Sequence, residues 1–184
     1  SAGYQVFASK EYMSRVRGGS NSTEIRIGTK RPIAFAQTID ILLPFDSAAL
    51  SHLAPRVTKE TLVLADTRTV KGISGIRIVD VPLVSTAEDA GSVIYVNTVA
   101  AGVVLGVIGA DIDDLYAYLE KLFSRKGDAV VSGNKTAALH GYKMGQHLAY
   151  AEHLEVSLSC DTSIKDELIM SGTDAISMGA IVGG

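Results

Sequence analysis

The chain has 184 residues, of which 47% are hydrophobic and 20% are charged. This length suits one domain with the start of a second, and this composition excludes a wholly disordered chain. With 17 basic and 20 acidic side chains the net charge is −3, so no general positive field attracts nucleic acid. The single cysteine, Cys160, cannot form an intramolecular disulfide or a four-cysteine site, which favours a reducing, cytoplasmic compartment.

Both ends of the sequence are typical of a chain cut within a longer fold. The first residues contain no initiator Met, basic segment or long apolar run, so no signal peptide is visible. Residues 1–4 are typical of a helix end followed by a strand, and residues 169–184 begin like a new helix. We therefore expect a chain that enters its fold partway through and is truncated at both ends.

The expected strands are short. Residues 4–8 are a first candidate, and residues 23–27 alternate polar and apolar side chains, with 33–35 expected to extend that sheet. The apolar runs 39–43 and 61–66 are typical of strands covered on both faces, and residues 76–81 alternate again.

The expected helices follow these strands. Residues 47–53 form a short helix with Asp46 or Ser47 as its cap, and residues 111–125 carry one apolar stripe behind a capping aspartate. Residues 130–147 are a further helix. Strands separated by helices predict an α/β domain with three layers and no membrane segment.

The most apolar stretch, residues 93–109, is predicted to be a buried helix. Its 17 residues fall short of the roughly 20 needed to cross a bilayer, and it contains polar side chains and glycines. Gly102 and Gly106 lie on one helical face and would let another backbone approach closely.

The segment 14–22 is the best local candidate for binding chemistry. Its guanidinium, glycine, hydroxyl and amide groups could cradle a phosphate or carboxylate, with backbone N–H groups as further donors. A flexible turn with two solvated arginines fits the same residues, and both interpretations stay open. The candidate binding residues are Arg15, Arg17, Gly18, Gly19, Ser20 and Asn21.

Two aspartates follow the ends of buried strands. Asp46 and Asp66 occupy the position where ligands bind in open α/β sheets, although aspartate there is also a common helix cap and turn residue. No metal site is predicted, because His140 and His147 are two turns apart and no carboxylate completes a set. No phosphate-binding fingerprint, general base or nucleophile is present either.

Several segments of the sequence resemble the gamma domain of 2-oxoacid:ferredoxin oxidoreductases. In that family a Glu-Tyr segment leads into Arg-Gly-Gly and then into a strand ending in Arg-Ile, as residues 11–27 do here. The resemblance continues to about residue 150. Its further motifs are the strands at 40–46 and 62–66, Asn97 with Gly102, and Asn134 with Ala137, Gly141 and Tyr142.

The resemblance implies a domain division and a fold. Residues 1–150 would be a three-layer, Rossmann-like gamma domain of the pyruvate:ferredoxin oxidoreductase type. Residues 151–184 would be a linker and the start of the alpha domain, which 171–180 resemble with Thr173 and Asp174 in place of Asn and Glu. The glycine-rich loop that usually opens the gamma domain is absent from this sequence.

The resemblance also implies a function for the complete enzyme. It would decarboxylate a 2-oxoacid, with 2-oxoglutarate expected, form acyl-coenzyme A and reduce ferredoxin. Thiamine diphosphate, Mg²⁺ and the iron–sulfur cluster would belong mostly to a separate beta subunit, so this chain would hold no cofactor alone and be inactive in isolation. The expected partners are that beta subunit, ferredoxin through the complex, and further copies of the chain.

Within that family the role of the chain itself has two interpretations. In the first, the arginine segment meets the phosphates of coenzyme A. In the second, the chain is a non-catalytic assembly domain whose arginines pair with a partner's carboxylates and whose Gly102/Gly106 face contacts another subunit. An unrelated nucleotide-binding α/β protein is a third possibility, disfavoured by the missing phosphate fingerprint.

Overall fold

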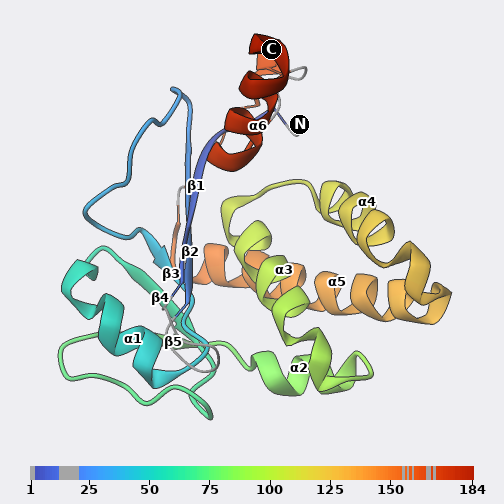
Figure 1. The fold of residues 1–184 in the computed structure, drawn as a ribbon. Coiled ribbons are helices and arrows are strands. Elements are labelled where there is room, and N and C mark those ends of the chain that lie inside the picture. Colours follow the sequence, from blue (N-terminus) through green and yellow to red (C-terminus); the bar gives the residue numbers. More distant parts are fainter. Residues whose placement is uncertain are drawn as a thin grey trace.

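The computed structural model describes residues 3–12, 21–154, 156, 158, 160–164, 167 and 169–184 (Figure 1). The strands are β1 (Gln5–Glu11), β2 (Ser22–Gly28), β3 (Ile41–Leu42), β4 (Leu62–Ala65) and β5 (Ile78–Asp80). The helices are α1 (Ser47–Leu53), α2 (Leu83–Asp89), α3 (Val96–Ile108), α4 (Ile112–Phe123), α5 (Asp128–Ala151) and α6 (Gly172–Gly183). Short 3-10 turns cover Ala54–Arg56, Val93–Tyr95, Ser124–Lys126 and Thr162–Ile164.

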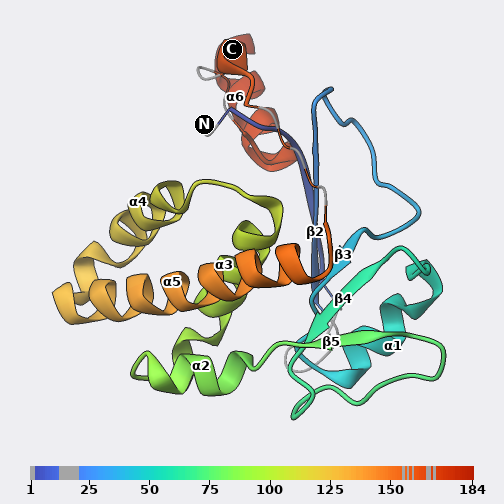
Figure 2. The same ribbon diagram turned by 180° about the vertical axis from the view of Figure 1, so that it is seen from behind.

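The strands β3, β4 and β5 form a parallel sheet with helices on both faces (Figures 1 and 2). Every residue of β4 is buried, and its side chains alternate between two apolar clusters. Leu62 and Leu64 pack in the cluster that includes α3, whereas Val63 and Ala65 pack in the cluster that includes Leu50 of α1. This alternation confirms the predicted α/β fold with three layers.

The strands β1 and β2 pair with each other as a separate antiparallel hairpin. The prediction that residues 33–35 extend this sheet is wrong, because they lie in irregular structure. Instead, the Phe35 ring packs edge-on against the Phe7 ring of β1 at a centroid distance of 5.4 Å. A tertiary contact with the hairpin therefore replaces the expected strand pairing.

The helices α3 and α5 pack backbone against backbone. A Cβ atom added at Gly102 would lie 2.3 Å from the Ala138 carbonyl oxygen, and one at Gly106 would lie 2.2 Å from that of Tyr142. In return, Gly141 and Gly145 of α5 would meet carbonyl oxygens of α3 at 2.1 Å. The close approach predicted for Gly102 and Gly106 is confirmed, but the expectation that this face contacts another subunit is wrong, because α5 of the same chain covers it.

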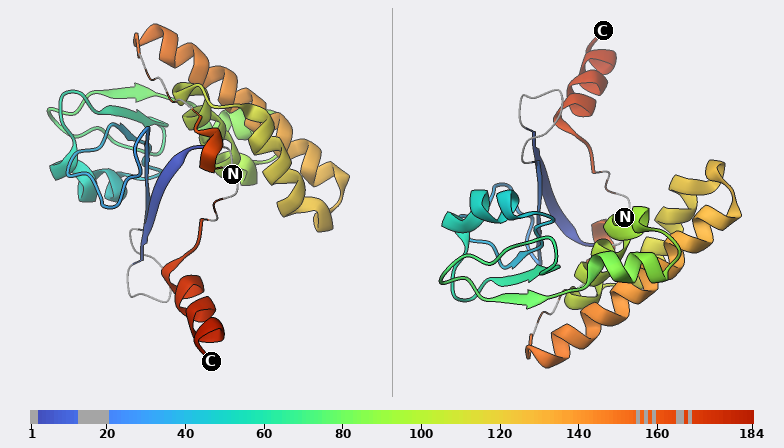
Figure 3. Two further views of the ribbon diagram at one scale, coloured as in Figure 1. Left: turned by 90° about the horizontal axis from the view of Figure 1, so that it is seen from above. Right: turned by 90° about the horizontal axis from the view of Figure 1, so that it is seen from below.

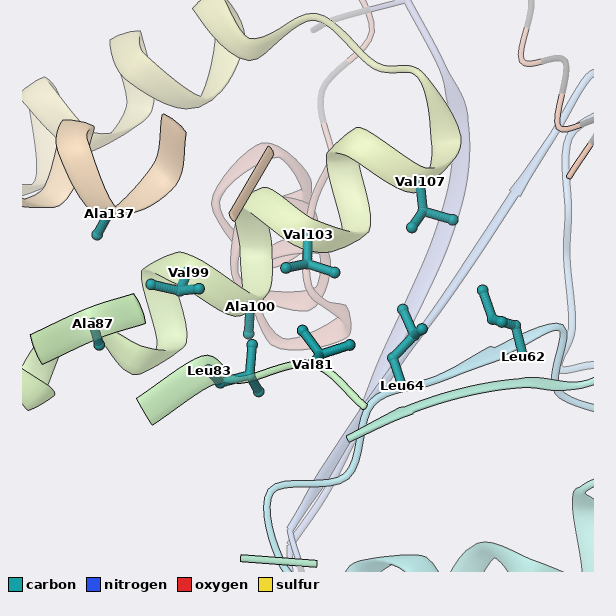
Figure 4. Close-up of a cluster of buried hydrophobic side chains, with 10 residues drawn as sticks. All are labelled: Leu62, Leu64, Val81, Leu83, Ala87, Val99, Ala100, Val103, Val107 and Ala137. Atoms are coloured by element: carbon teal, nitrogen blue, oxygen red, sulfur yellow. The ribbon is translucent and has the colours of Figure 1, made fainter. Parts of the chain in front are cut away.

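This helix pair completes the larger core cluster. Figure 4 shows Val99, Val103 and Val107 of α3 above Leu64 and the neighbouring apolar residues of the sheet. The three valines are at most 2% exposed. Burial of this kind contributes roughly 1.5–3 kcal/mol per large apolar side chain.

The helices α1 and α4 begin as predicted. The Asp46 carboxylate accepts a hydrogen bond from the Ala49 N–H at 2.7 Å, and the Asp111 carboxylate accepts one from the Asp113 N–H at 2.9 Å. The α5 helix starts earlier and ends later than predicted.

The last helix, α6, lies apart from the parallel sheet and from the helices that cover it (Figure 3). Ser171 and Asp174 form a reciprocal capping box at its start, and none of its residues is buried. No helix in the described part of the chain is long and apolar enough to cross a membrane.

Candidate functional site

Most of the predicted binding segment lies outside the described residues. Arg15, Arg17, Gly18, Gly19 and Ser20 belong to the undescribed range 13–20. Of the six candidate binding residues in the segment, the structure describes only Asn21, which is exposed. The strands on both sides are described, and their pairing continues to Glu11 opposite Ser22. The direction of the hairpin therefore locates the two ends of the segment.

The hairpin contacts the last turn of α1 and the 3-10 turn that follows it. Glu24, farther from the segment, accepts a hydrogen bond at 2.9 Å from Arg56, which follows α1. Glu11, the last paired residue of β1, has its carboxylate 3.5 Å from the imidazole Nε2 of His52, one helical turn earlier. From Glu24 to Glu11 the hairpin contacts thus move about one turn back along the chain, from Arg56 to the last turn of α1.

The beginning of α1 lies at the carboxyl edge of the parallel sheet. Asp46 caps α1 there after β3, and Asp66 follows β4, the strand that pairs with β3. Ser47 also contributes to this edge, because its hydroxyl accepts a hydrogen bond from the Lys71 N–H at 2.8 Å. The two aspartates therefore lie at the edge of the sheet where α/β proteins bind ligands.

Asp66 is engaged through both carboxylate oxygens. It is 2% exposed, and Oδ2 accepts a hydrogen bond at 3.0 Å from the N–H of Val84 in the first turn of α2. Oδ1 accepts one at 3.0 Å from the Arg68 N–H and one at 3.4 Å from the Arg68 guanidinium. Burial acts to raise the pKa of Asp66, but the hydrogen bonds from Val84 and Arg68 outweigh it and lower the pKa. In this arrangement Asp66 ties the sheet to α2 as an ionised carboxylate.

Sequence reasoning missed Arg56, which organises the surface beside the hairpin. Its guanidinium donates hydrogen bonds to the Ala36 carbonyl at 2.9 Å and the Gln37 carbonyl at 3.3 Å, besides its bond to Glu24. The hydrogen bond to Glu24 raises the pKa of Arg56. No local motif around Arg56 predicts this role, since its partners are 19 or more residues away. A hollow of about 330 Å³ lies beside it, lined by Ser9, Lys10, Glu11, Ser22, Glu24, Phe35 and Arg56.

The residues present do not fit the metal groups that the resemblance implies for the whole enzyme. An iron–sulfur cluster is held by several cysteine thiolates, and the chain has one cysteine. That residue, Cys160, is exposed. The burial of Tyr4 and its hydrogen bond with Cys160 raise the pKa of the tyrosine. Among the described residues, no three side chains of His, Cys, Asp or Glu lie close enough together to hold a metal ion.

The sequence profile of one protein family, described as "Pyruvate ferredoxin/flavodoxin oxidoreductase", matches residues 1–144. The chain belongs to this family. No curated protein matches the sequence.

Two solved structures share the fold of this family member. A 2-oxoglutarate:ferredoxin oxidoreductase from Magnetococcus marinus, solved with 2-oxoglutarate, coenzyme A and succinyl-CoA bound, is similar with a TM-score of 0.81 and 24% identity. That match covers 100% of this chain but 32% of the other, so the chain spans about a third of that relative's length. The gamma subunit of a keto/oxoacid ferredoxin oxidoreductase from Geobacter sulfurreducens PCA is similar with a TM-score of 0.60 and 23% identity, over 79% of this chain and 82% of the subunit.

The motifs that carry the family resemblance hold the helical layer together. The Asn134 side chain, 3% exposed, accepts a hydrogen bond from the Thr98 hydroxyl at 2.7 Å and donates one to the Val130 carbonyl at 2.9 Å. The Tyr142 hydroxyl donates to the Ala110 carbonyl at 2.8 Å, and Gly102 and Gly141 form the close helix contact. These residues identify the fold of the oxidoreductase domain rather than its chemistry.

Proposed function

We propose that this chain is the gamma domain, with the start of an alpha domain, of a 2-oxoacid:ferredoxin oxidoreductase that forms acyl-coenzyme A from 2-oxoglutarate. The family match over residues 1–144 is the observation that carries the proposal. The proposed domain division at about residue 150 is supported by the end of α5 at Ala151, where the linker would begin. The substrate is supported by the relative solved with 2-oxoglutarate and coenzyme A bound.

The oxidation itself belongs to groups held elsewhere in the complete enzyme. Thiamine diphosphate, Mg²⁺ and an iron–sulfur cluster would supply the decarboxylation and electron transfer from a beta subunit, with ferredoxin as acceptor and the cytoplasm as location. The contribution of this chain is to cover the active centre and to receive coenzyme A.

The arginine segment is the part of this chain proposed to meet coenzyme A. Arg15 and Arg17 would contact the phosphates, Gly18 and Gly19 would permit close backbone approach, and Ser20 and Asn21 would add hydrogen bonds. The contact of Glu11 with His52 brings the end of β1 to α1, the helix that Asp46 caps, and this supports placing the segment near that edge of the sheet. At that edge the two aspartates would limit the space available to the phosphates, because carboxylates repel them.

Replacing Arg17 with alanine tests the ligand role in the assembled enzyme. Charge-assisted hydrogen bonds are worth about 1.5–3 kcal/mol, so Arg17→Ala should weaken apparent coenzyme A affinity roughly 10-fold or more. The affinities for 2-oxoglutarate and ferredoxin should change little. Lys59→Ala is the matched control. It removes an exposed cation that precedes β4, at the end of the strand opposite Asp66, and should leave the affinities for coenzyme A, 2-oxoglutarate and ferredoxin unchanged.

The second interpretation, a domain that serves only in assembly, makes the opposite prediction. It is favoured by the finding that the Asp46 and Asp66 carboxylates both accept hydrogen bonds from their own backbone neighbourhood. In that case Arg17→Ala would loosen the subunits on gel filtration and leave the coenzyme A constant of the assembled fraction unaltered. An unaltered constant in fully assembled enzyme rejects the ligand role of Arg17. Comparison of kcat/KM for 2-oxoglutarate and pyruvate tests the substrate separately.

A further inference from the structure

The segment between α5 and α6 begins with firm contacts to the domain that precedes it. Residues 152–170 include no glycine and no proline, so their composition is not that of a flexible tether. The Glu152 carboxylate accepts two hydrogen bonds from the Arg77 guanidinium, at 2.7 and 2.8 Å. Leu154 packs against the larger core cluster. The first residues after α5 are therefore held against the sheet and the helical layer.

Farther along, the segment contacts the β1–β2 hairpin. The Asp161 N–H donates a hydrogen bond to the Gly3 carbonyl at 2.7 Å, and the Asp161 carboxylate accepts one from the Gln5 side-chain amide at 3.4 Å. Gln5 is the first residue of β1 and pairs with Gly28, the last residue of β2. These contacts therefore lie at the end of the hairpin away from its connecting segment, which we call the open end.

The 3-10 turn Thr162–Ile164 continues the contact with the open end. The Asp161 carboxylate also accepts a hydrogen bond from the Ser163 N–H at 2.9 Å, and Ile164 is 7% exposed. Beyond the turn, the Glu167 carboxylate forms an ion pair with Arg31, which follows β2. An exposed ion pair alone contributes little to stability, but this one closes a series of contacts that begins at Glu152.

We propose that these residues form an anchored strap that fixes the start of the alpha domain to the open end of the hairpin. We call the described residues between Glu152 and Glu167 the strap. The proposal rests on the proposed division into gamma and alpha domains. Ordering each residue costs about 1–2 kcal/mol of backbone entropy, which the contacts of the strap must offset. With the strap docked, α6 is presented from a fixed exit point, whereas a free tether would let it take many positions.

The single cysteine of the chain provides a direct probe, because Cys160 lies in the strap. A Cβ atom added at Gly3 would lie 3.6 Å from the Cβ of Cys160. Disulfides join Cβ atoms roughly 3.5–4.5 Å apart, so Gly3→Cys should form a disulfide with Cys160 when the strap is docked. Gly75→Cys is the matched control. Gly75 has a positive φ of 86°, like Gly3 with 78°, but its added Cβ has nothing within 4 Å.

A redox titration of the 184-residue chain in glutathione buffers measures the effective concentration of the two thiols. Flexible linkers give effective concentrations of roughly millimolar. We expect Gly3→Cys to exceed that level, and the Gly75→Cys value, by at least about 10-fold. The added Cβ at Gly3 also lies 3.2 Å from the Asp161 carbonyl oxygen, a tight contact, so a measurement on the unmodified chain is needed as well. Hydrogen exchange of the Asp161 N–H, which donates to Gly3, should be slowed at least about 10-fold relative to an unstructured chain.

Charge reversal tests the far end of the strap. In the Gly3→Cys chain, Arg31→Glu and Glu167→Arg should each lower the effective concentration about 5-fold, because attraction becomes repulsion. The double reversal should restore it. Lys30→Glu is the matched control and should have no effect, since Lys30 is exposed and forms no ion pair with the described residues. Circular dichroism checks that each variant folds.

Two results would overturn the proposal. One is a Gly3→Cys chain that forms its disulfide no more readily than Gly75→Cys while the Asp161 N–H exchanges freely. The other is a pair of single reversals that the double reversal does not restore. Both readouts are independent of turnover, so a strap that passes them in an enzyme that oxidises no 2-oxoacid would reject the proposed function alone.

Discussion

Helices α3 and α6 are both apolar and contain glycines, yet their environments are opposite. Six residues of α3 are buried, and no residue of α6 is. Two glycines of α3 face carbonyl oxygens of α5 within 2.3 Å of an added Cβ atom, whereas Gly179 of α6 has nothing within 4 Å. An apolar sequence thus indicates that a helix needs a covering surface, but not where that surface lies.

The largest difference should appear between a methyl group added at an α5 glycine that contacts α3 and one added at a glycine of α6. Gly141→Ala places a methyl group against the Val99 carbonyl oxygen of α3 and should destabilise the chain by about 3 kcal/mol. Gly179→Ala, the matched change in α6, should alter stability by at most about 1 kcal/mol, and in the stabilising direction. Urea denaturation followed by circular dichroism measures both. Equal effects at the two positions would mean that the α3–α5 contact is looser than described.

A smaller loss of stability is expected at the carboxyl edge of the sheet, where Asp66 binds the first turn of α2. Asp66→Asn should cost about 1–2 kcal/mol at pH 7, because the amide cannot accept all the hydrogen bonds that the carboxylate accepts. The pKa of Asp66 is lowered in the folded chain, so its stabilisation is complete above the ordinary value of 3.8 and is lost as pH falls through the folded-state pKa. The difference in the free energy of unfolding between wild type and Asp66→Asn should therefore shrink as the pH falls, as measured by urea denaturation at several pH values. A difference that widens in acid would contradict the assigned role.

The smallest effect is expected on the exposed surface of α6. Ile181 is 81% exposed, so Ile181→Ser should change the free energy of unfolding by no more than about 0.5 kcal/mol. Val103→Ser is the matched change in α3, where the side chain is 0% exposed, and it should cost several times more. A loss at Ile181 as large as that at Val103 would show that α6 is covered in solution.

Much of this fold is predictable because its signals are local. Capping by Asp46, the apolar stripe of α4 and the buried run of β4 each depend on residues within a few positions of one another. The cap and the buried run are confirmed, whereas in the α4 stripe Leu119 is buried but Leu122 is exposed. The close approach at Gly102 and Gly106 was also predictable, but its partner was not identified. The equal spacing of Gly141 and Gly145 in α5 was the available signal, since two helices with glycines four apart can fit together.

The remaining features depend on residues far apart in the sequence. Nothing near residues 33–35 indicates that Phe35 packs on Phe7 instead of joining a strand. Likewise, nothing near Arg56 indicates that it binds the carbonyls of Ala36 and Gln37. For the candidate site, the positions of Asp46 and Asp66 after strands were predictable, whereas the direction of the hairpin became clear only from its contacts with His52 and Arg56.

The most direct test of the whole account is 2-oxoacid-dependent reduction of a viologen dye. We predict no activity for the purified chain alone, because it lacks the cysteines for an iron–sulfur cluster. We predict coenzyme A-dependent activity for the enzyme assembled with its beta subunit. The assay uses 2-oxoglutarate and pyruvate at saturating concentrations, with and without coenzyme A. Dye reduction by the chain alone, or an assembled enzyme that oxidises no 2-oxoacid, would contradict the account.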